Sequence, residues 1–104
     1  MKIRNKKGGY SIRVAREYID PSLPIYSLST ELEIQYRFDE KKPTNDISSY
    51  KAWFIQEGLP PFTVKFIEEV TLPTFQALVS FENLQACEVN RNVYFKADNI
   101  KEVK

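Results

Sequence analysis

Hydrophobic and polar residues alternate along several short stretches of this chain. The clearest stretch covers residues 31–38, where Leu32, Ile34, Tyr36 and Phe38 are separated by charged or amide side chains. A period of two residues sends alternate side chains to opposite faces of a strand. We therefore predict a strand here, with one face in the core and one in solvent.

A second pair of alternating stretches is separated by a turn signal. Residues 49–56 and 62–67 each have this period, and 57–61 between them contains Gly58 and two adjacent prolines. Glycine permits a positive φ angle, and proline cannot donate a hydrogen bond to a sheet. The pattern predicts a hairpin.

Three other stretches are less regular. We predict a first strand within 10–19, a strand over 77–82, and a last strand over 89–100 that is split or bulged near 90–92. A one- or two-turn helix over 73–77 also fits the spacing of the apolar residues.

The polar segments between these stretches predict loops. Residues 20–24 contain two prolines and form a connection, and 39–46 has no apolar residue and is expected to be a mobile surface loop. We expect 101–104 to fray and 1–9 to form a flexible basic arm. Residues 10–104 then form a single domain.

Six short strands without a long helix predict an all-β fold with room for one short helix. A closed barrel removes exposed strand edges, which suits a chain that is 42% hydrophobic. We predict a small Greek-key barrel of about six strands that is OB-like, that is, of the oligonucleotide-binding type.

Charge is unevenly distributed, although the net charge is only +1. Six basic residues precede Glu17, the first acidic residue, and the rest of the chain is net negative. A basic arm indicates either a polyanionic partner such as nucleic acid or a solvated leader. The cations of the arm are Lys2, Arg4, Lys6 and Lys7.

The composition removes the usual parts of an enzyme. Histidine is absent, and Cys87 is the single cysteine, in an apolar setting that favours a core role. No phosphate-binding glycine motif and no calcium-loop spacing is present. We expect no catalysis, no metal and no cofactor. No apolar run is long enough to span a membrane and no signal peptide is evident, so we expect a cytoplasmic location.

Aromatic residues interleaved with basic ones are the remaining chemical signal. They occur around Arg37, Lys51 and Lys96, and this combination holds single-stranded nucleic acid, because rings stack on bases and cations follow the backbone. Trp53 and Tyr94 share a strand face with a lysine and are candidates for either core packing or ligand contact. The candidate body residues are Lys51, Trp53, Lys65, Tyr94 and Lys96.

The C-terminal half resembles a known family. The shared features are a strand ending in proline at 70–73, an aromatic at Phe75, a strand closing near asparagine at 77–83, and the run at 94–100. In these features the chain resembles the YdcP-like family, small replication accessory proteins of conjugative transposons. The resemblance covers about half of the chain and implies an accessory of mobile-element DNA replication that assists a host helicase beside a relaxase.

Two functions follow as hypotheses. The first is non-catalytic binding of single-stranded DNA, as a helicase-processivity accessory of a conjugative mobile genetic element. The alternative is a protein–protein adaptor or a phage-type structural subunit without nucleic-acid binding, which the near-neutral charge and the aromatic content favour.

Overall fold

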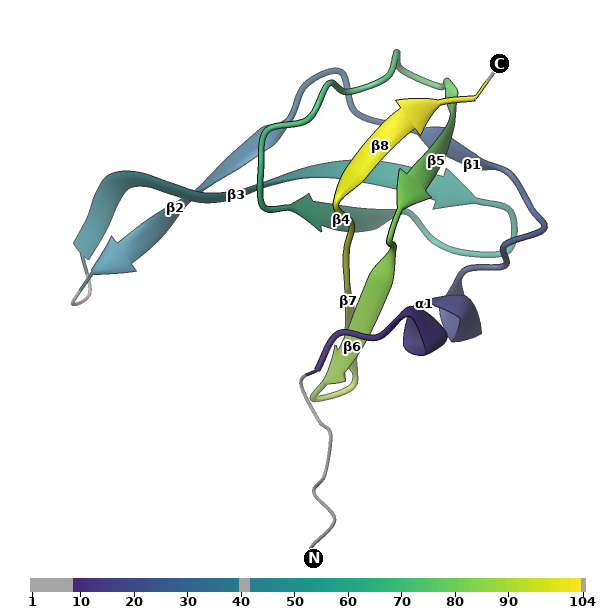
Figure 1. Ribbon diagram of the computed structural model, residues 1–104, viewed down its shortest axis with the longest axis horizontal. Coiled ribbons are helices and arrows are strands. Elements are labelled where there is room, and N and C mark those ends of the chain that lie inside the picture. The colour runs from purple at the N-terminus through teal and green to yellow at the C-terminus, as the bar shows by residue number, and fades with distance from the viewer. Residues whose placement is uncertain (1–8, 40–41, 104) are drawn as a thin grey trace, which may run out of the picture.

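The computed structural model describes residues 9–39 and 42–103. This part of the chain is mostly β structure, with one short helix and eight strands in one open sheet (Figure 1). In chain order the elements are α1 (Ile12–Tyr18), β1 (Ile25–Ser27), β2 (Glu33–Asp39), β3 (Lys42–Gln56), β4 (Phe62–Phe66), β5 (Leu78–Glu82), β6 (Gln85–Val89), β7 (Asn92–Lys96) and β8 (Asn99–Glu102). Residues 1–8 of the predicted arm lie outside the described residues.

The strand order corrects the predicted barrel. It runs β6-β7-β4-β3-β1-β5-β8, and β2 pairs with β3 beside this path. The path ends at β6 and at β8 and does not close. β5 lies next to β8 near one end and β6 lies at the other, and Asn83, between these two strands in sequence, has a φ angle of 58°. The closed barrel and the count of six strands are therefore wrong, and the OB-like Greek-key arrangement is not confirmed.

Aromatic side chains from four strands form the centre of the core. Phe54 on β3 and Phe66 on β4 are fully buried, and the ring of Phe81 on β5 meets Phe54 edge to face, with 5.0 Å between the centroids. Phe62 and Phe95 lie 5.3 Å apart beside them. Such ring pairs add about 1 kcal/mol each beyond the apolar area that they bury.

The predicted first strand within 10–19 is wrong, because Ile12–Tyr18 is helical. Ser11 is the N-cap, and its hydroxyl accepts a hydrogen bond from the Val14 N–H at 3.3 Å. The buried Ala15 and Ile19 are four residues apart, so one face of the helix packs on the core. The helix has seven residues, and no helix within 9–39 and 42–103 is long and apolar enough to cross a membrane.

The strand predicted over 31–38 is found as β2, but the burial expected for Ile34 and Tyr36 is wrong, and β3 begins at Lys42, within the predicted loop over 39–46. β2 and the first half of β3 form a two-stranded ribbon, which stays paired as far as Asp39 opposite Lys42 and projects away from the rest of the sheet (Figure 1). Pairing with β4 begins only at Tyr50, so no further strand supports the ribbon. Among the ribbon side chains that the structure describes, three large apolar ones are 46%, 51% and 43% exposed: Ile34, Tyr36 and Ile47.

The central hairpin is confirmed. β3 and β4 pair in antiparallel register with Trp53 opposite Thr63, and Gly58 has a φ angle of 91° in the turn. The strand predicted over 77–82 is also found, as β5. Residues 73–77 do not form a helix, and the short strand β1 was not predicted.

The last strand predicted over 89–100 is interrupted near 90–92, as expected, but the interruption is a hairpin turn between β6 and β7, and β8 follows as a separate strand. Asn90 and Arg91 have φ angles of 51° and 71°, and Val89 pairs with Asn92 across them. Two consecutive residues with positive φ are typical of the tight I′ hairpin turn. The fraying predicted over 101–104 is wrong for Lys101 and Glu102, which belong to β8. Lys104 lies outside the described residues.

Candidate nucleic-acid interface

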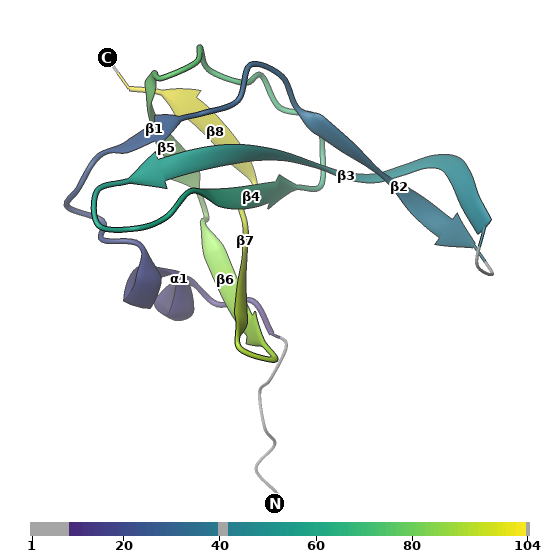
Figure 2. The ribbon, with the colours of Figure 1, turned by 180° about the vertical axis from the view of Figure 1, so that it is seen from behind.

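Three lysines stand side by side on neighbouring strands. Lys51 on β3 lies opposite Lys65 on β4, and Lys65 lies opposite Lys96 on β7. Figure 2 shows β3 beside β4, with β7 crossing next to β4. Residues directly opposite each other point to the same face, and neighbouring strands are about 5 Å apart. The three lysines thus form a continuous row of cations across the sheet.

Two exposed rings share the face of this row. Trp53 follows Lys51 by two residues and is 40% exposed, and Tyr94 precedes Lys96 by two residues and is 48% exposed. These two positions were open between core packing and ligand contact, and both lie at the surface. We call the five residues together the lysine face: Lys51, Trp53, Lys65, Tyr94 and Lys96. The structure therefore brings all five predicted body residues together, while Lys2, Arg4, Lys6 and Lys7 lie outside the described residues.

Polar contacts fix the position of Trp53. Its indole Nε1–H donates to a Glu33 carboxylate oxygen at 3.0 Å, and its backbone N–H donates to the Ser29 hydroxyl at 2.8 Å. Glu33 also lies 4.0 Å from the Lys51 ammonium group. This exposed ion pair is worth at most about 1 kcal/mol, so a phosphate can compete for Lys51.

Tyr10 is a member of this site that the sequence analysis missed. The ammonium groups of Lys96 and Lys65 lie 4.7 and 5.5 Å from the centroid of its ring, within the range of a cation–π contact. Burial raises the pKa of Tyr10, and a hydrogen bond with the Cys87 thiol raises it further. Its position depends on two backbone hydrogen bonds between Ser11 and Ala86 on β6, and no local sequence pattern predicts such a long-range bridge.

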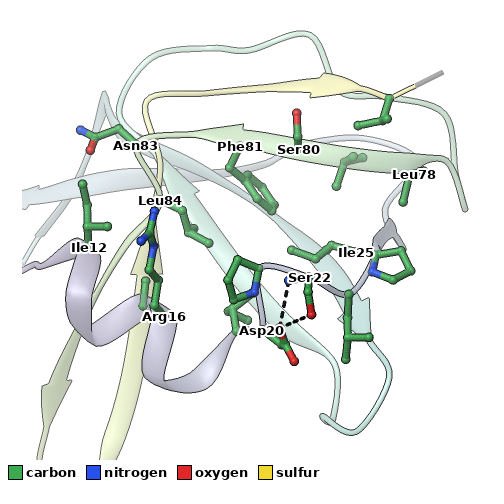
Figure 3. Close-up of a pocket in the computed structure, with 17 residues that line it drawn as sticks. Ile12, Arg16, Asp20, Ser22, Ile25, Leu78, Ser80, Phe81, Asn83 and Leu84 are labelled. Carbon is green, nitrogen blue, oxygen red and sulfur yellow. Dashed lines mark hydrogen bonds between the residues drawn. The ribbon is translucent and has the colours of Figure 1, made fainter.

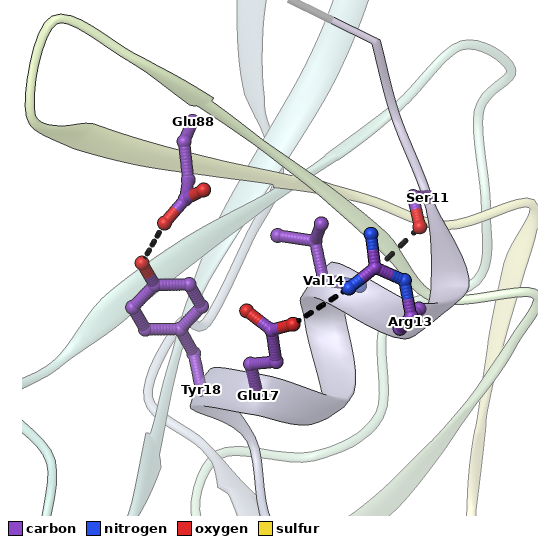
Figure 4. A network of polar contacts seen from close by, with 6 residues as sticks. All are labelled: Ser11, Arg13, Val14, Glu17, Tyr18 and Glu88. Carbon is purple, nitrogen blue, oxygen red and sulfur yellow. Dashed lines mark hydrogen bonds and ion pairs between the residues drawn. The ribbon is translucent and has the colours of Figure 1, made fainter. Parts of the chain in front are cut away.

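The helix that follows Tyr10 is tied to β6 by polar contacts (Figure 4). The Tyr18 hydroxyl donates to the Glu88 carboxylate, and this hydrogen bond raises the pKa of Tyr18. Arg13 pairs with Glu17 at 3.0 Å along the helix surface. Glu88 points to the opposite side of β6 from Cys87, so its negative charge is directed away from the lysine face.

Acidic residues limit the positive strip at both ends. Glu33 lies opposite Lys51 on β2. Beyond Lys96 is a small hollow of about 220 Å³ that Glu68 and Asp98 also line. The strip is therefore three strands wide, which suits a single nucleic-acid strand better than an extended duplex.

The lysine face presents groups that can contact a polyanion. It offers ammonium groups, aromatic rings and the phenol of Tyr10, whereas the neighbouring Cys87 is buried. Within residues 9–39 and 42–103, no group of three or more acidic or cysteine side chains is placed to hold a metal ion.

Comparison of the chain with protein-family models, with curated proteins and with solved structures gives no match.

Proposed function

We propose that this protein binds single-stranded DNA across the lysine face. The observation that carries the proposal is the row formed by Lys51, Lys65 and Lys96 in direct register, with exposed Trp53 and Tyr94 on the same side. Cations at this spacing follow a phosphate backbone, while the two rings offer surfaces on which bases stack. The protein acts without catalysis.

The expected salt dependence can be estimated from the number of cations. Neutralising three phosphates of a single strand gives a slope of about −2 for the logarithm of the binding constant against the logarithm of salt concentration. If the four cations of the arm also contact phosphates, the slope becomes about −5. The slope therefore separates binding by the lysine face alone from binding that includes the arm.

The fluorescence of Trp53 provides a direct test, because it is the single tryptophan of the chain. We expect oligothymidine to quench this fluorescence as bases stack on the indole. Replacing Lys51, Lys65 and Lys96 together by glutamine should remove most binding at low salt, and Tyr94→Ala should weaken it by about tenfold or more.

Two matched variants serve as controls. Lys101→Gln removes an exposed lysine on β8, away from the lysine face, and should leave affinity nearly unchanged. Replacing Lys2, Arg4, Lys6 and Lys7 by glutamine measures how much the arm contributes to the affinity for DNA. The proposal would be refuted if the triple glutamine variant bound DNA as tightly as the wild type. It would also be refuted if the wild type did not bind DNA at tens of micromolar protein.

Binding to single-stranded DNA would suit the role that the family resemblance implies. We propose that it is a helicase-processivity accessory in the replication of a conjugative mobile element, acting with a host helicase and the element's relaxase. The test is helicase unwinding of a forked duplex with and without the protein. We expect the wild-type protein to extend the length of duplex that the helicase unwinds. The triple glutamine variant should not do so.

A second candidate function is supported by the ribbon of β2 and β3. Ile34, Tyr36 and Ile47 lie on one face of it and are each more than two-fifths exposed, which is typical of a surface for another protein. A protein–protein adaptor or phage-type structural subunit would use this ribbon and would not need the lysine face. Light scattering after size-exclusion chromatography tests self-association, which Tyr36→Lys should abolish if the ribbon is responsible.

A further inference from the structure

A groove separates α1 from β5 on the core side of the sheet, away from the lysine face. Its volume is about 640 Å³, and it is lined by α1, by the loop over 20–24 and by β5 (Figure 3). The floor consists of buried or half-buried core side chains, among them Ile19, Ile25 and Phe81. None of the five residues of the lysine face contributes to it.

The size and character of this groove are those of a site for a small molecule. Ligand sites in proteins usually measure 300–1,000 Å³ and are mostly apolar with a few polar groups. Here the apolar lining continues from the floor to the rim, where Ile12, Leu23 and Val103 are exposed. Isolated exposed apolar residues are common, but three around one concave apolar surface favour an apolar ligand.

The lining contains two charged residues, Asp20 and Arg16, which differ in their polar partners. The Asp20 carboxylate accepts hydrogen bonds from the Ser22 N–H at 2.9 Å and the Ser22 hydroxyl at 2.7 Å, and these bonds lower its pKa. The guanidinium group of Arg16 has no ion pair with any carboxylate in the described part of the chain. Figure 3 shows Arg16 on α1 and Asp20 hydrogen-bonded to Ser22 in the loop. The groove thus offers one available cation above an apolar floor.

We propose that this groove binds a small amphipathic carboxylate, with its apolar body on Ile25 and Phe81 and its carboxylate paired with Arg16. Arg16 favours an anionic head group, because no carboxylate in the described part of the chain pairs with it. Asp20 keeps its negative charge, since both Ser22 bonds go to one of its carboxylate oxygens, so the head group must lie at the Arg16 end of the groove and away from the loop over 20–24. The site is separate from the proposed DNA-binding surface and does not depend on it.

Isothermal titration with dodecanoate, kept below the concentration at which it forms micelles, tests the proposal. We expect one saturable site with a Kd of about 10 μM. Dodecanol, which has the same chain without the charge, should bind about tenfold more weakly, and dodecylamine, which Arg16 repels, should also bind more weakly than dodecanoate. Arg16→Gln should weaken dodecanoate by about tenfold and leave dodecanol unchanged.

Matched variants distinguish binding in the groove from nonspecific hydrophobic binding. Arg13→Gln removes a cation of the same helix that pairs with Glu17 and does not line the groove, so it should not alter affinity. Leu23→Asp, at the exposed rim, should weaken dodecanoate without unfolding the protein. The proposal is overturned if dodecanoate does not bind, if dodecylamine binds best, or if Arg16→Gln and Arg13→Gln have equal effects.

Discussion

Gln56 is expected to be one of the most sensitive polar positions in the protein. Its side chain is 2% exposed and makes three hydrogen bonds to the loop that follows α1. The amide Nε2 donates to the backbone carbonyls of Asp20 at 2.8 Å and Leu23 at 3.1 Å, and Oε1 accepts from the Asp20 N–H at 3.0 Å. Replacement by leucine keeps the volume and removes all three bonds.

The expected loss can be worked out from these contacts. Each hydrogen bond contributes about 1 kcal/mol net, and the three backbone groups become partly accessible to water when the loop relaxes, so we expect Gln56→Leu to cost about 2–3 kcal/mol. In a domain of this size that corresponds to a decrease in Tm of about 10–20 °C. Thermal unfolding followed by circular dichroism measures it. Gln85→Leu on β6, where the side chain makes no hydrogen bond to another described residue, is the matched control and should change Tm little.

Gln56→Glu adds a dependence on pH. The glutamate carboxylate would face two carbonyl oxygens, so its pKa in the folded state should lie above the unfolded value of about 4.3. A raised folded pKa contributes stability below the unfolded pKa, and that stability is lost as pH rises through the folded pKa. The variant should therefore be closest to the wild type near pH 4 and weakest at neutral pH. A leucine variant as stable as the wild type, or a glutamate variant insensitive to pH, would refute the role assigned to Gln56.

Three further outcomes are expected. Arg91→Gly should raise the free energy of unfolding by about 0.5 kcal/mol, because it relieves a φ of 71°, whereas Asn92→Gly inside β7 should lower it; urea titration measures both. Ser11→Ala should cost about 1 kcal/mol of stability through the lost helix cap, measured by the same titration. Because burial and Cys87 raise the pKa of Tyr10, its contribution to stability is present below its unfolded pKa of about 10 and is lost as pH rises through the folded value. Alkaline titration of tyrosinate absorbance should show two groups with raised midpoints, Tyr10 and Tyr18, and one of them should disappear in Tyr10→Phe.

The strands that were predicted correctly have one buried apolar face and one polar face. In β3 and β4 the buried Phe54 and Phe66 alternate with Lys51 and Lys65, so the period of two reports directly on burial. The ribbon has the same alternation without a core beneath it. Alternation indicates a strand but does not show which surface, if any, covers its apolar side, and this is why the exposure of Ile34 was not predicted.

The helix was missed for a related reason. β-Branched and aromatic residues between Tyr10 and Ile19 also fit a strand, and the helix signal was the pair Ala15 and Ile19 following the capping Ser11. The turn at 90–91 has asparagine but lacks the glycine that usually marks an I′ turn.

The candidate site was predictable within each strand and not between strands. Alternation places Lys51 with Trp53, and Lys96 with Tyr94, on common faces. The pairing of β4 with β7 that sets Lys65 next to Lys96 joins residues about thirty positions apart, and no local pattern specifies it. The same holds for Tyr10, whose place depends on the bridge between Ser11 and Ala86.

The parallel pairing of β4 with β7 has a consequence for the order of folding. Local hairpins such as β3–β4 can close early, whereas a parallel contact between distant segments must first overcome the entropy of closing a long loop. Val64 lies opposite Phe95 in this pairing, so the step that completes the row of cations also buries a ring of the core. If the lysine face binds single-stranded DNA as proposed, a chain that is still folding would bind it weakly, and the binding surface would form together with the native state.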